Sequence, residues 1–173
     1  PVPFAPSFYG LDFSELPALI GAFAYGPVAG VMIEFCKILI KLVLKPSSTA
    51  FVGELANFSI SCMLVLPASV IYLFKKSRKQ AILGTVVGTL IMTAFGSCFN
   101  AIYLLPKFSE LYGIPLDAII GMGTAINPAI HSISGLVLMC VVPLNLLKGG
   151  LVSLITILVY KKLSPILKAA HKQ

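Results

Sequence analysis

Apolar residues along this chain form long runs that short polar segments separate. The clearest run, LGTVVGTLIMTAFGSCFNAIYLL, carries no charge and extends from Leu83 to Leu105. Two more runs cover about residues 55–74 and 135–159. A helix needs about 20 consecutive apolar residues to cross the hydrocarbon core of a bilayer. The three runs therefore predict three transmembrane helices.

A fourth apolar region, from Phe13 to Leu44, is interrupted by AYGP at residues 24–27. Glycine followed by proline favours a turn and a new helix start. We therefore predict two helices here, the first of them short for a transmembrane span. The whole pattern predicts an all-α fold, a polytopic helical bundle that forms one integral membrane domain over residues 1–173. Its five predicted spans cover about residues 13–25, 27–44, 55–74, 83–105 and 135–159.

Composition and charge agree with a membrane environment. Of the 173 residues, 58% are hydrophobic and 11% charged, whereas soluble domains carry about 25% charged residues. The net charge of +7 comes from 13 basic and 6 acidic residues, and most of the basic ones lie in two clusters, KKSRKQ and YKKLSPILKAAHKQ. Both clusters follow apolar runs, so the positive-inside rule explains them. We expect a lipid bilayer, and no nucleic acid, as a partner.

Two predicted spans separate the basic clusters, so both can face the cytoplasm. The sequence thus predicts a multi-pass protein of the cell membrane with a cytoplasmic C-terminus. The outer segments are then PVPFAPSFYGLDFSE, KPSSTAFVGE and LPKFSELYGIPLDAIIGMGTAINPAIHS. A chain that begins PVPFAPSF, without initiator methionine or signal peptide, is expected to be truncated, with a further span ending near Pro1.

Polar residues inside the predicted spans are costly, at about 2.5–3.5 kcal/mol for a charge near the centre of a helix. Lys148 is the clearest case, and Asn145 lies one turn before it on the same face. Pro143 removes a backbone donor and loosens the preceding turn. Lys148 is too deep for easy snorkelling, so we favour a ligand or a buried partner for it. The alternative is pairing with a neighbouring carboxylate or snorkelling to the surface.

Three more polar residues lie toward the outer side. Asn100, near the outer end of its span, either points inward or meets headgroups. Glu54 and Asn57, within GELANF, are three residues apart and share a helix face, although Glu54 also suits the positive end of its helix dipole. These residues predict an outward-facing pocket for a flat, partly polar molecule. Aromatic residues of the outer segments would roof it: Phe8, Tyr9 and Phe13.

Other motifs favour structural roles. Glu34, Lys37 and Lys41 are spaced as an internal salt-bridged stripe, and Gly84 and Gly88, four residues apart, would let helices approach closely. The four cysteines lack the spacing of a metal site or a disulfide framework. The sequence has no Walker A motif and no nucleophile paired with a base. We therefore predict no catalytic residues, no metal and no cofactor, and hence no enzyme.

Several ordered motifs resemble those of one family: LDFSELPALIGAFAYGPVAGVMIE, GELANF, AINPAI, PLNLLKG and YKKLSP. Together they resemble the riboflavin-binding S component, which is the substrate-capture subunit of energy-coupling factor (ECF) transporters, over nearly the whole chain. The family has six helices, and we expect the first to be missing here. That helix carries the motif for docking on the coupling subunit, so no docking residues are assigned.

The resemblance implies high-affinity capture of riboflavin from outside and its transport into the cell. The partners would be the ECF transmembrane coupling subunit and two ATPase subunits, which would hydrolyse ATP. Riboflavin is then a transported ligand and not a cofactor. The resemblance places its binding residues at Leu11, Asp12, Glu54, Asn57, Asn100, Asn145 and Lys148.

Two alternatives stay open. One is an S component for a different vitamin, because the Lys148 charge would suit an anionic ligand. The other is a non-transport membrane assembly subunit, in which the buried lysine pairs with a glutamate on a partner helix and binds no small molecule. Replacing Lys148 with methionine in such a protein should leave it stable or improve it.

Overall fold

The computed structural model describes the backbone of residues 5–6, 13–47 and 49–170, and side chains within these ranges up to Val159. All regular structure in these ranges is helical, which confirms the predicted all-α class. The elements are α1 (Glu15–Tyr25), α2 (Pro27–Leu44), α3 (Val52–Lys75), α4 (Arg78–Phe99), the π-helix η1 (Asn100–Leu104), α5 (Leu105–Tyr112), α6 (Leu116–Thr124), α7 (Ile133–Leu136), the π-helix η2 (Val137–Val141) and α8 (Val142–Ala170).

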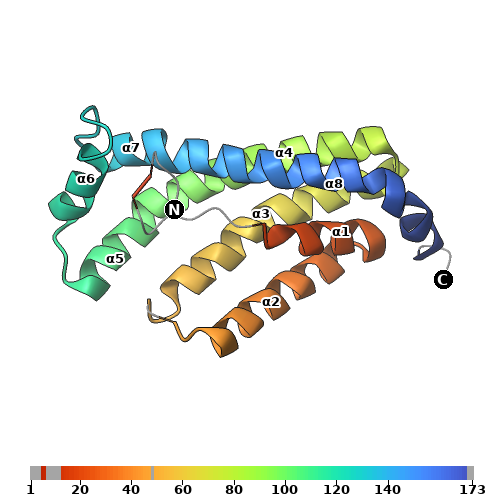
Figure 1. The fold of residues 1–173 in the computed structure, drawn as a ribbon, viewed down its shortest axis with the longest axis horizontal. Helices are drawn as coiled ribbons and strands as arrows, with labels where there is room; N and C mark the ends of the chain where they lie inside the picture. Colours follow the sequence, from red (N-terminus) through yellow and green to blue (C-terminus); the bar gives the residue numbers. More distant parts are fainter. Residues whose placement is uncertain (1–4, 7–12, 48, 171–173) are drawn as a thin grey trace.

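Three long helical stretches form the body of the molecule. α4 and α8 lie side by side along the long axis, and α3 packs against α4 (Figure 1). The stretches that are long and apolar enough to cross a membrane are Val52–Lys75, Arg78–Tyr112 and Ile133–Val159. They contain the three apolar runs that the sequence analysis predicts as transmembrane helices.

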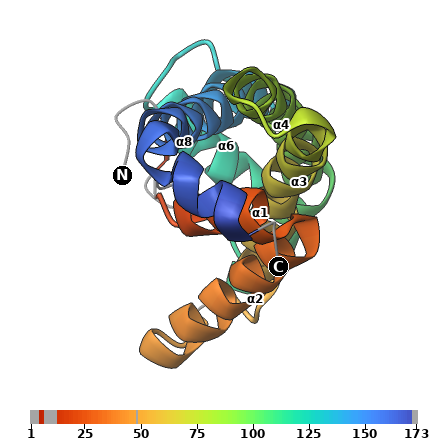
Figure 2. The ribbon, with the colours of Figure 1, turned by 90° about the vertical axis from the view of Figure 1, so that its right-hand side faces the viewer.

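The two remaining helices differ from these three. α1 has only 11 residues, and α2 carries the three charges of Glu34, Lys37 and Lys41. α1 packs against α2, α3 and α8, while α2 lies at the edge of the bundle (Figure 2). That both helices are membrane spans stays a prediction. The predicted break between them is confirmed, because Gly26 has a φ of 97° and Pro27 begins α2.

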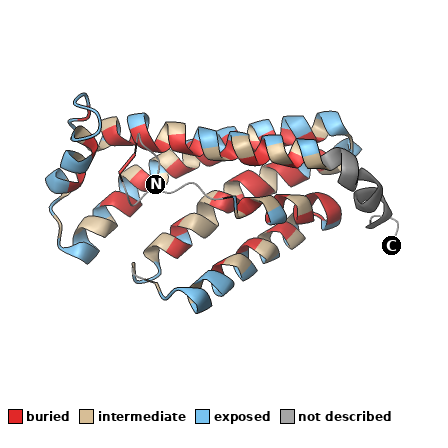
Figure 3. Ribbon diagram, in the orientation of Figure 1, coloured by how far each residue is buried: buried red, intermediate tan, exposed pale blue. Residues whose placement is uncertain are grey.

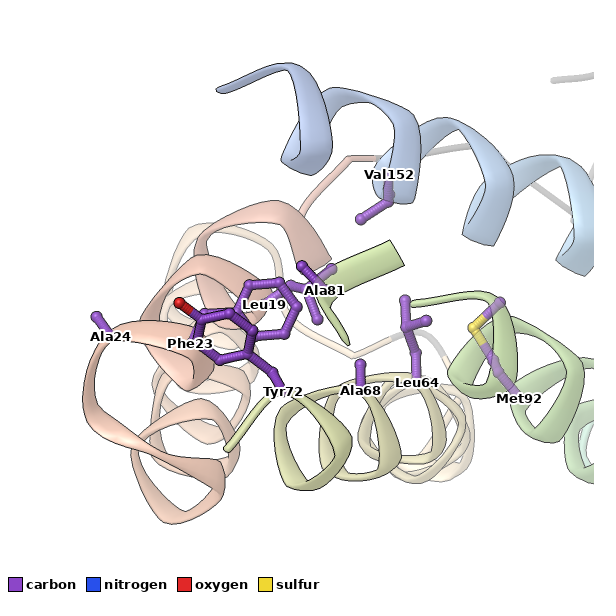
Figure 4. Close-up of a cluster of buried hydrophobic side chains, with 9 residues drawn as sticks. All are labelled: Leu19, Phe23, Ala24, Leu64, Ala68, Tyr72, Ala81, Met92 and Val152. Atoms are coloured by element: carbon purple, nitrogen blue, oxygen red, sulfur yellow. The ribbon is translucent and has the colours of Figure 1, made fainter. Parts of the chain in front are cut away.

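One apolar cluster joins α1, α3, α4 and α8 in the half of the bundle that holds the α3–α4 turn (Figure 4). The rings of Phe23 and Tyr72 stack there, with centroids 4.5 Å apart. Gly84 and Gly88 allow the close approach of α3 and α4, because a Cβ at either would lie 2.5 Å from a backbone oxygen of Ala68 or Leu64. Buried residues accordingly face the inside of the bundle (Figure 3).

The end of the molecule opposite the α3–α4 turn contains two short helices, α5 and α6. Most of the predicted outer segment LPKFSELYGIPLDAIIGMGTAINPAIHS forms α5 and α6, and a second apolar cluster, which includes Leu105, Ile119 and Leu136, fixes it to the bundle. η1 precedes Pro106 and η2 precedes Pro143. A π-turn holds one more residue than an α-turn and so accommodates the missing N–H and the ring of a nearby proline. The loosened turn expected before Pro143 is thus confirmed.

Candidate ligand-binding site

A cavity of about 410 Å³ lies where the α2–α3 loop meets the first turns of α3, η1 and the start of α8. All the predicted site residues that the structure describes line this one cavity: Glu54, Asn57, Asn100, Asn145 and Lys148. The other two, Leu11 and Asp12, lie outside the described residues, as do Phe8 and Tyr9. Phe13 is about half-exposed and is not part of the cavity wall.

The size and lining of the cavity suit a small organic molecule. Ligand pockets typically enclose about 300–1,000 Å³ and combine apolar walls with a few polar groups. Ile60, Leu104 and Leu144 supply apolar surface here, beside the polar residues named above. Among the described residues, no group of His, Cys, Asp and Glu could hold a metal ion.

Lys148 forms an ion pair at the cavity wall. Its Nζ lies 2.6 Å from Oε1 of Glu15, whose side chain is 0% exposed. The same Oε1 accepts a 2.7 Å hydrogen bond from the hydroxyl of Ser61. Glu15 ends the predicted outer segment PVPFAPSFYGLDFSE and also falls within the predicted span 13–25. The structure places it in the first turn of α1, with its side chain buried inside the bundle. The carboxylate partner considered as the alternative for Lys148 is therefore present, while Lys148 still reaches the cavity.

The charged residues of α2 form ion pairs within the helix and also with neighbouring helices. Lys37 lies 2.5 Å from Glu34, as the spacing predicted, and also 3.4 Å from Oε1 of Glu15. Lys41 instead lies 3.9 Å from Glu54 on α3. Ion pairs thus join α2 to both α1 and α3, which spacing along one helix could not indicate.

Glu54 anchors the loop between α2 and α3. Its Oε2 accepts hydrogen bonds from the hydroxyls of Ser47 at 2.7 Å and Thr49 at 3.1 Å. Those hydroxyls in turn accept from the backbone N–H groups of Phe51 and Gly53. The loop passes through left-handed backbone at Phe51, with a φ of 67°. Glu54 therefore holds an unusual loop conformation and also presents its side chain to the cavity.

The two asparagines of the wall differ in their hydrogen bonding. Asn100 is buried and points inward, and its Nδ2 donates to the carbonyl of Gly96 at 2.7 Å. Asn145 is also buried, yet its Nδ2 has no hydrogen-bond partner among the described residues. Gly96 makes room for this amide, because a Cβ there would lie 2.8 Å from it. A buried N–H without a partner costs about 1–3 kcal/mol, and because Asn145 lines the cavity, this residue is a candidate donor to a ligand.

Sequence reasoning missed several residues of the wall. Ser61 and Lys45 line the cavity, and Glu15 holds Lys148 from behind it. A signal for Glu15 was available, since a carboxylate directly before an apolar helix is a natural partner for an intramembrane lysine. Ser61 gave no such signal, because serine is common in membrane helices as a packing residue.

Comparison with known proteins places the chain among membrane transport proteins. Residues 1–160 match the family model "ECF transporter, substrate-specific component". The riboflavin transporter RibU of Staphylococcus aureus is 33% identical over 168 residues, which are 97% of this chain and 82% of that protein. The riboflavin transporter FmnP of Bacillus subtilis is 30% identical over 168 residues, 95% of this chain and 82% of that protein.

A solved structure shares the fold. It is described as "Structure and mechanism of the S component of a bacterial ECF transporter" and superposes with a TM-score of 0.71 at 34% identity. The match covers 97% of this chain and 85% of the other.

Proposed function

The chain belongs to the family of ECF transporter substrate-specific components, and from this membership we propose that it captures riboflavin outside the cell as the substrate-binding subunit of such a transporter. With its three long apolar helices, the chain is a multi-pass membrane protein. Two of its relatives are named riboflavin transporters. The observation that carries the proposal is the convergence of Glu54, Asn57, Asn100, Asn145 and Lys148 on one cavity.

The chemistry of riboflavin suits this wall. The edge of the isoalloxazine ring alternates hydrogen-bond donors and acceptors, which amides and an ammonium can meet. The ribityl hydroxyls suit carboxylates and amides, and the flat ring suits the apolar surfaces of Ile60 and Leu144. Burying polar groups that only the right ligand satisfies makes a site selective. Leu11 and Asp12 belong to the proposed site as well.

The proposed assembly contains a transmembrane coupling subunit and two ATPases, and ATP hydrolysis belongs to the ATPases. The chain itself is proposed to bind and deliver the ligand, without catalysis and without a cofactor. The α3–α4 turn with its basic cluster and the end of α8 lie at the same end of the molecule (Figure 1). A cytoplasmic position for this end, and so for the C-terminus, follows the positive-inside rule. The cavity then opens toward the other side.

The ion pair at the cavity wall weakens the case for an anionic vitamin. Lys148 was the reason to consider one, but the carboxylate of Glu15 lies 2.6 Å from its ammonium. The cavity therefore presents a compensated charge at this point.

The first experiment is a visible absorption spectrum of the detergent-purified protein, followed by riboflavin titration with flavin fluorescence as the signal. We expect saturable, stoichiometric quenching, and a loss of affinity of about tenfold or more in Asn145→Leu, because one buried hydrogen bond to the ligand is lost. Asn127→Leu is the matched control, since Asn127 is exposed and outside the cavity. A folded wild-type protein that leaves flavin fluorescence unchanged would overturn the proposal, and a vitamin panel would follow.

A further inference from the structure

Lys148 is a long, flexible side chain in a place where flexibility would harm recognition. A lysine has four rotatable side-chain bonds and a point charge that can address partners in many directions. The side chain of Lys148 is 11% exposed and borders the cavity. Something must therefore hold its ammonium in one position before a ligand arrives.

Glu15 is placed to do this. Its Oε1 lies 2.6 Å from Lys148 Nζ and is itself fixed by the hydroxyl of Ser61 at 2.7 Å. Glu15 stands in the first turn of α1, where the helix dipole favours a negative charge. α1 packs against α2, α3 and α8. This packing fixes the position of the Glu15 carboxylate relative to Lys148 on α8.

Glu15 does not line the cavity, and its side chain is fully buried behind it. It can therefore influence a ligand only through another residue. The surrounding charges are balanced, with the carboxylates of Glu15 and Glu34 against the ammonium groups of Lys37 and Lys148. Removing one member of such a set leaves an uncompensated buried charge.

We propose that Glu15 is a positioning residue of the riboflavin site, which holds the Lys148 ammonium at the cavity wall in the geometry that the ligand meets. The inference rests on the proposed function and deepens it. Ligand affinity should then depend on how α1 packs against α8, because a shift of α1 moves the Glu15 carboxylate and with it the Lys148 ammonium.

A double-mutant cycle distinguishes positioning from a purely structural role. The dissociation constant for riboflavin is measured by flavin quenching for wild type, Glu15→Gln, Lys148→Met and the double variant. We expect each single substitution to weaken binding by about tenfold to hundredfold, the size of one charge-assisted hydrogen bond. The double variant should bind no more weakly than Lys148→Met alone, because Glu15 then has nothing left to position. Fold-losses that simply multiply would overturn the inference, as would an unchanged dissociation constant in Glu15→Gln.

Two further variants keep the test sharp. Glu34→Gln removes an equally buried carboxylate of the same network that forms its ion pair with Lys37 rather than with Lys148, so it measures how much affinity is lost through charge imbalance alone. Its loss should be smaller than that of Glu15→Gln and should persist in the Lys148→Met background. If Glu15→Gln does not yield folded protein, Glu15→Asp replaces it in the cycle. It keeps the charge but shortens the reach, and we expect a loss that again disappears in the Lys148→Met background.

The two proposals fail in different ways. A folded wild-type protein that does not quench riboflavin contradicts the proposed function. Wild-type binding together with independent effects at Glu15 and Lys148 contradicts only the positioning role.

Discussion

The same helices build two very different halves of this bundle. Toward the α3–α4 turn, α1, α3, α4 and α8 meet in an apolar cluster around Phe23 and Tyr72. Toward the α2–α3 loop, α3, η1 and α8 meet around a cavity edged with amides and charges. On α3, for example, Glu54 and Asn57 face the cavity and Leu64 enters the apolar cluster.

The difference between the two halves suggests that the apolar half mainly supplies stability and the cavity half mainly supplies ligand binding. In a membrane, apolar side chains gain little from leaving lipid, so helices associate through close packing, and the small residues Gly84 and Gly88 make that possible. The cavity half instead keeps buried polar groups, including the Asn145 amide without a partner, which cost free energy in the empty protein. We propose that one half chiefly holds the bundle together and that the other forms the ligand site.

The largest expected effect lies in the apolar half. Phe23→Ala should lower the free energy of unfolding by about 3 kcal/mol, the low end for such a substitution, because lipid also solvates the apolar surface. Thermal unfolding of the detergent-purified protein, followed by circular dichroism, measures this. The control is Phe74→Ala, since Phe74 is 76% exposed and Phe23 only 1%. Similar losses in both variants would show that the cluster does not dominate stability.

A smaller effect, of opposite sign, is expected in the cavity half. Asn145→Leu should raise the free energy of unfolding of the ligand-free protein by about 1 kcal/mol, because it removes a buried N–H without a partner. Asn100→Leu is the matched comparison and should destabilise by a similar amount, since Asn100 donates to Gly96. Thermal unfolding without flavin measures both. A destabilised Asn145→Leu protein would mean that this amide is satisfied in the empty state.

The smallest effect is expected at a polar contact beside the apolar cluster. The hydroxyls of Thr89 and Ser153 lie 3.4 Å apart and link α4 to α8. Ser153→Ala should cost about 0.6 kcal/mol, the average for a hydrogen bond between membrane helices. The same unfolding assay measures it, and riboflavin affinity should not change. A loss as large as that of Phe23→Ala would place polar contacts, and not apolar packing, at the centre of bundle stability.

The sequence predicted the parts of this molecule that depend on local pattern. Apolar run length located the three long helices, and the Gly26–Pro27 step located the turn between α1 and α2. The candidate site was predictable for a related reason. A polar residue in an apolar run is costly wherever it faces lipid, which favoured an interior position for Lys148 and left Asn100 either inward or at the headgroups. The structure places Asn100, Asn145 and Lys148 at the cavity.

Most features that the sequence did not predict depend on contacts between segments that are distant in the chain. No spacing relates Glu15 to Lys148, because their contact exists only after α1 packs against α8. Lys41 likewise reaches Glu54 across a helix interface and not Glu34 along its own helix. The helices α5 and α6 were not predicted for another reason. Proline and glycine are typical of loops, but here Pro106 follows a π-turn at the start of α5 and Gly113 ends that helix.

The Glu15–Lys148 pair also bears on how the chain is made. Proteins are synthesised from the N-terminus, so the carboxylate on α1 exists before the lysine on α8 has left the ribosome. Until α8 takes its place, Glu15 lacks this partner, and burying it with the network incomplete would be costly. The buried charge network is therefore completed only when the last helix has packed against α1.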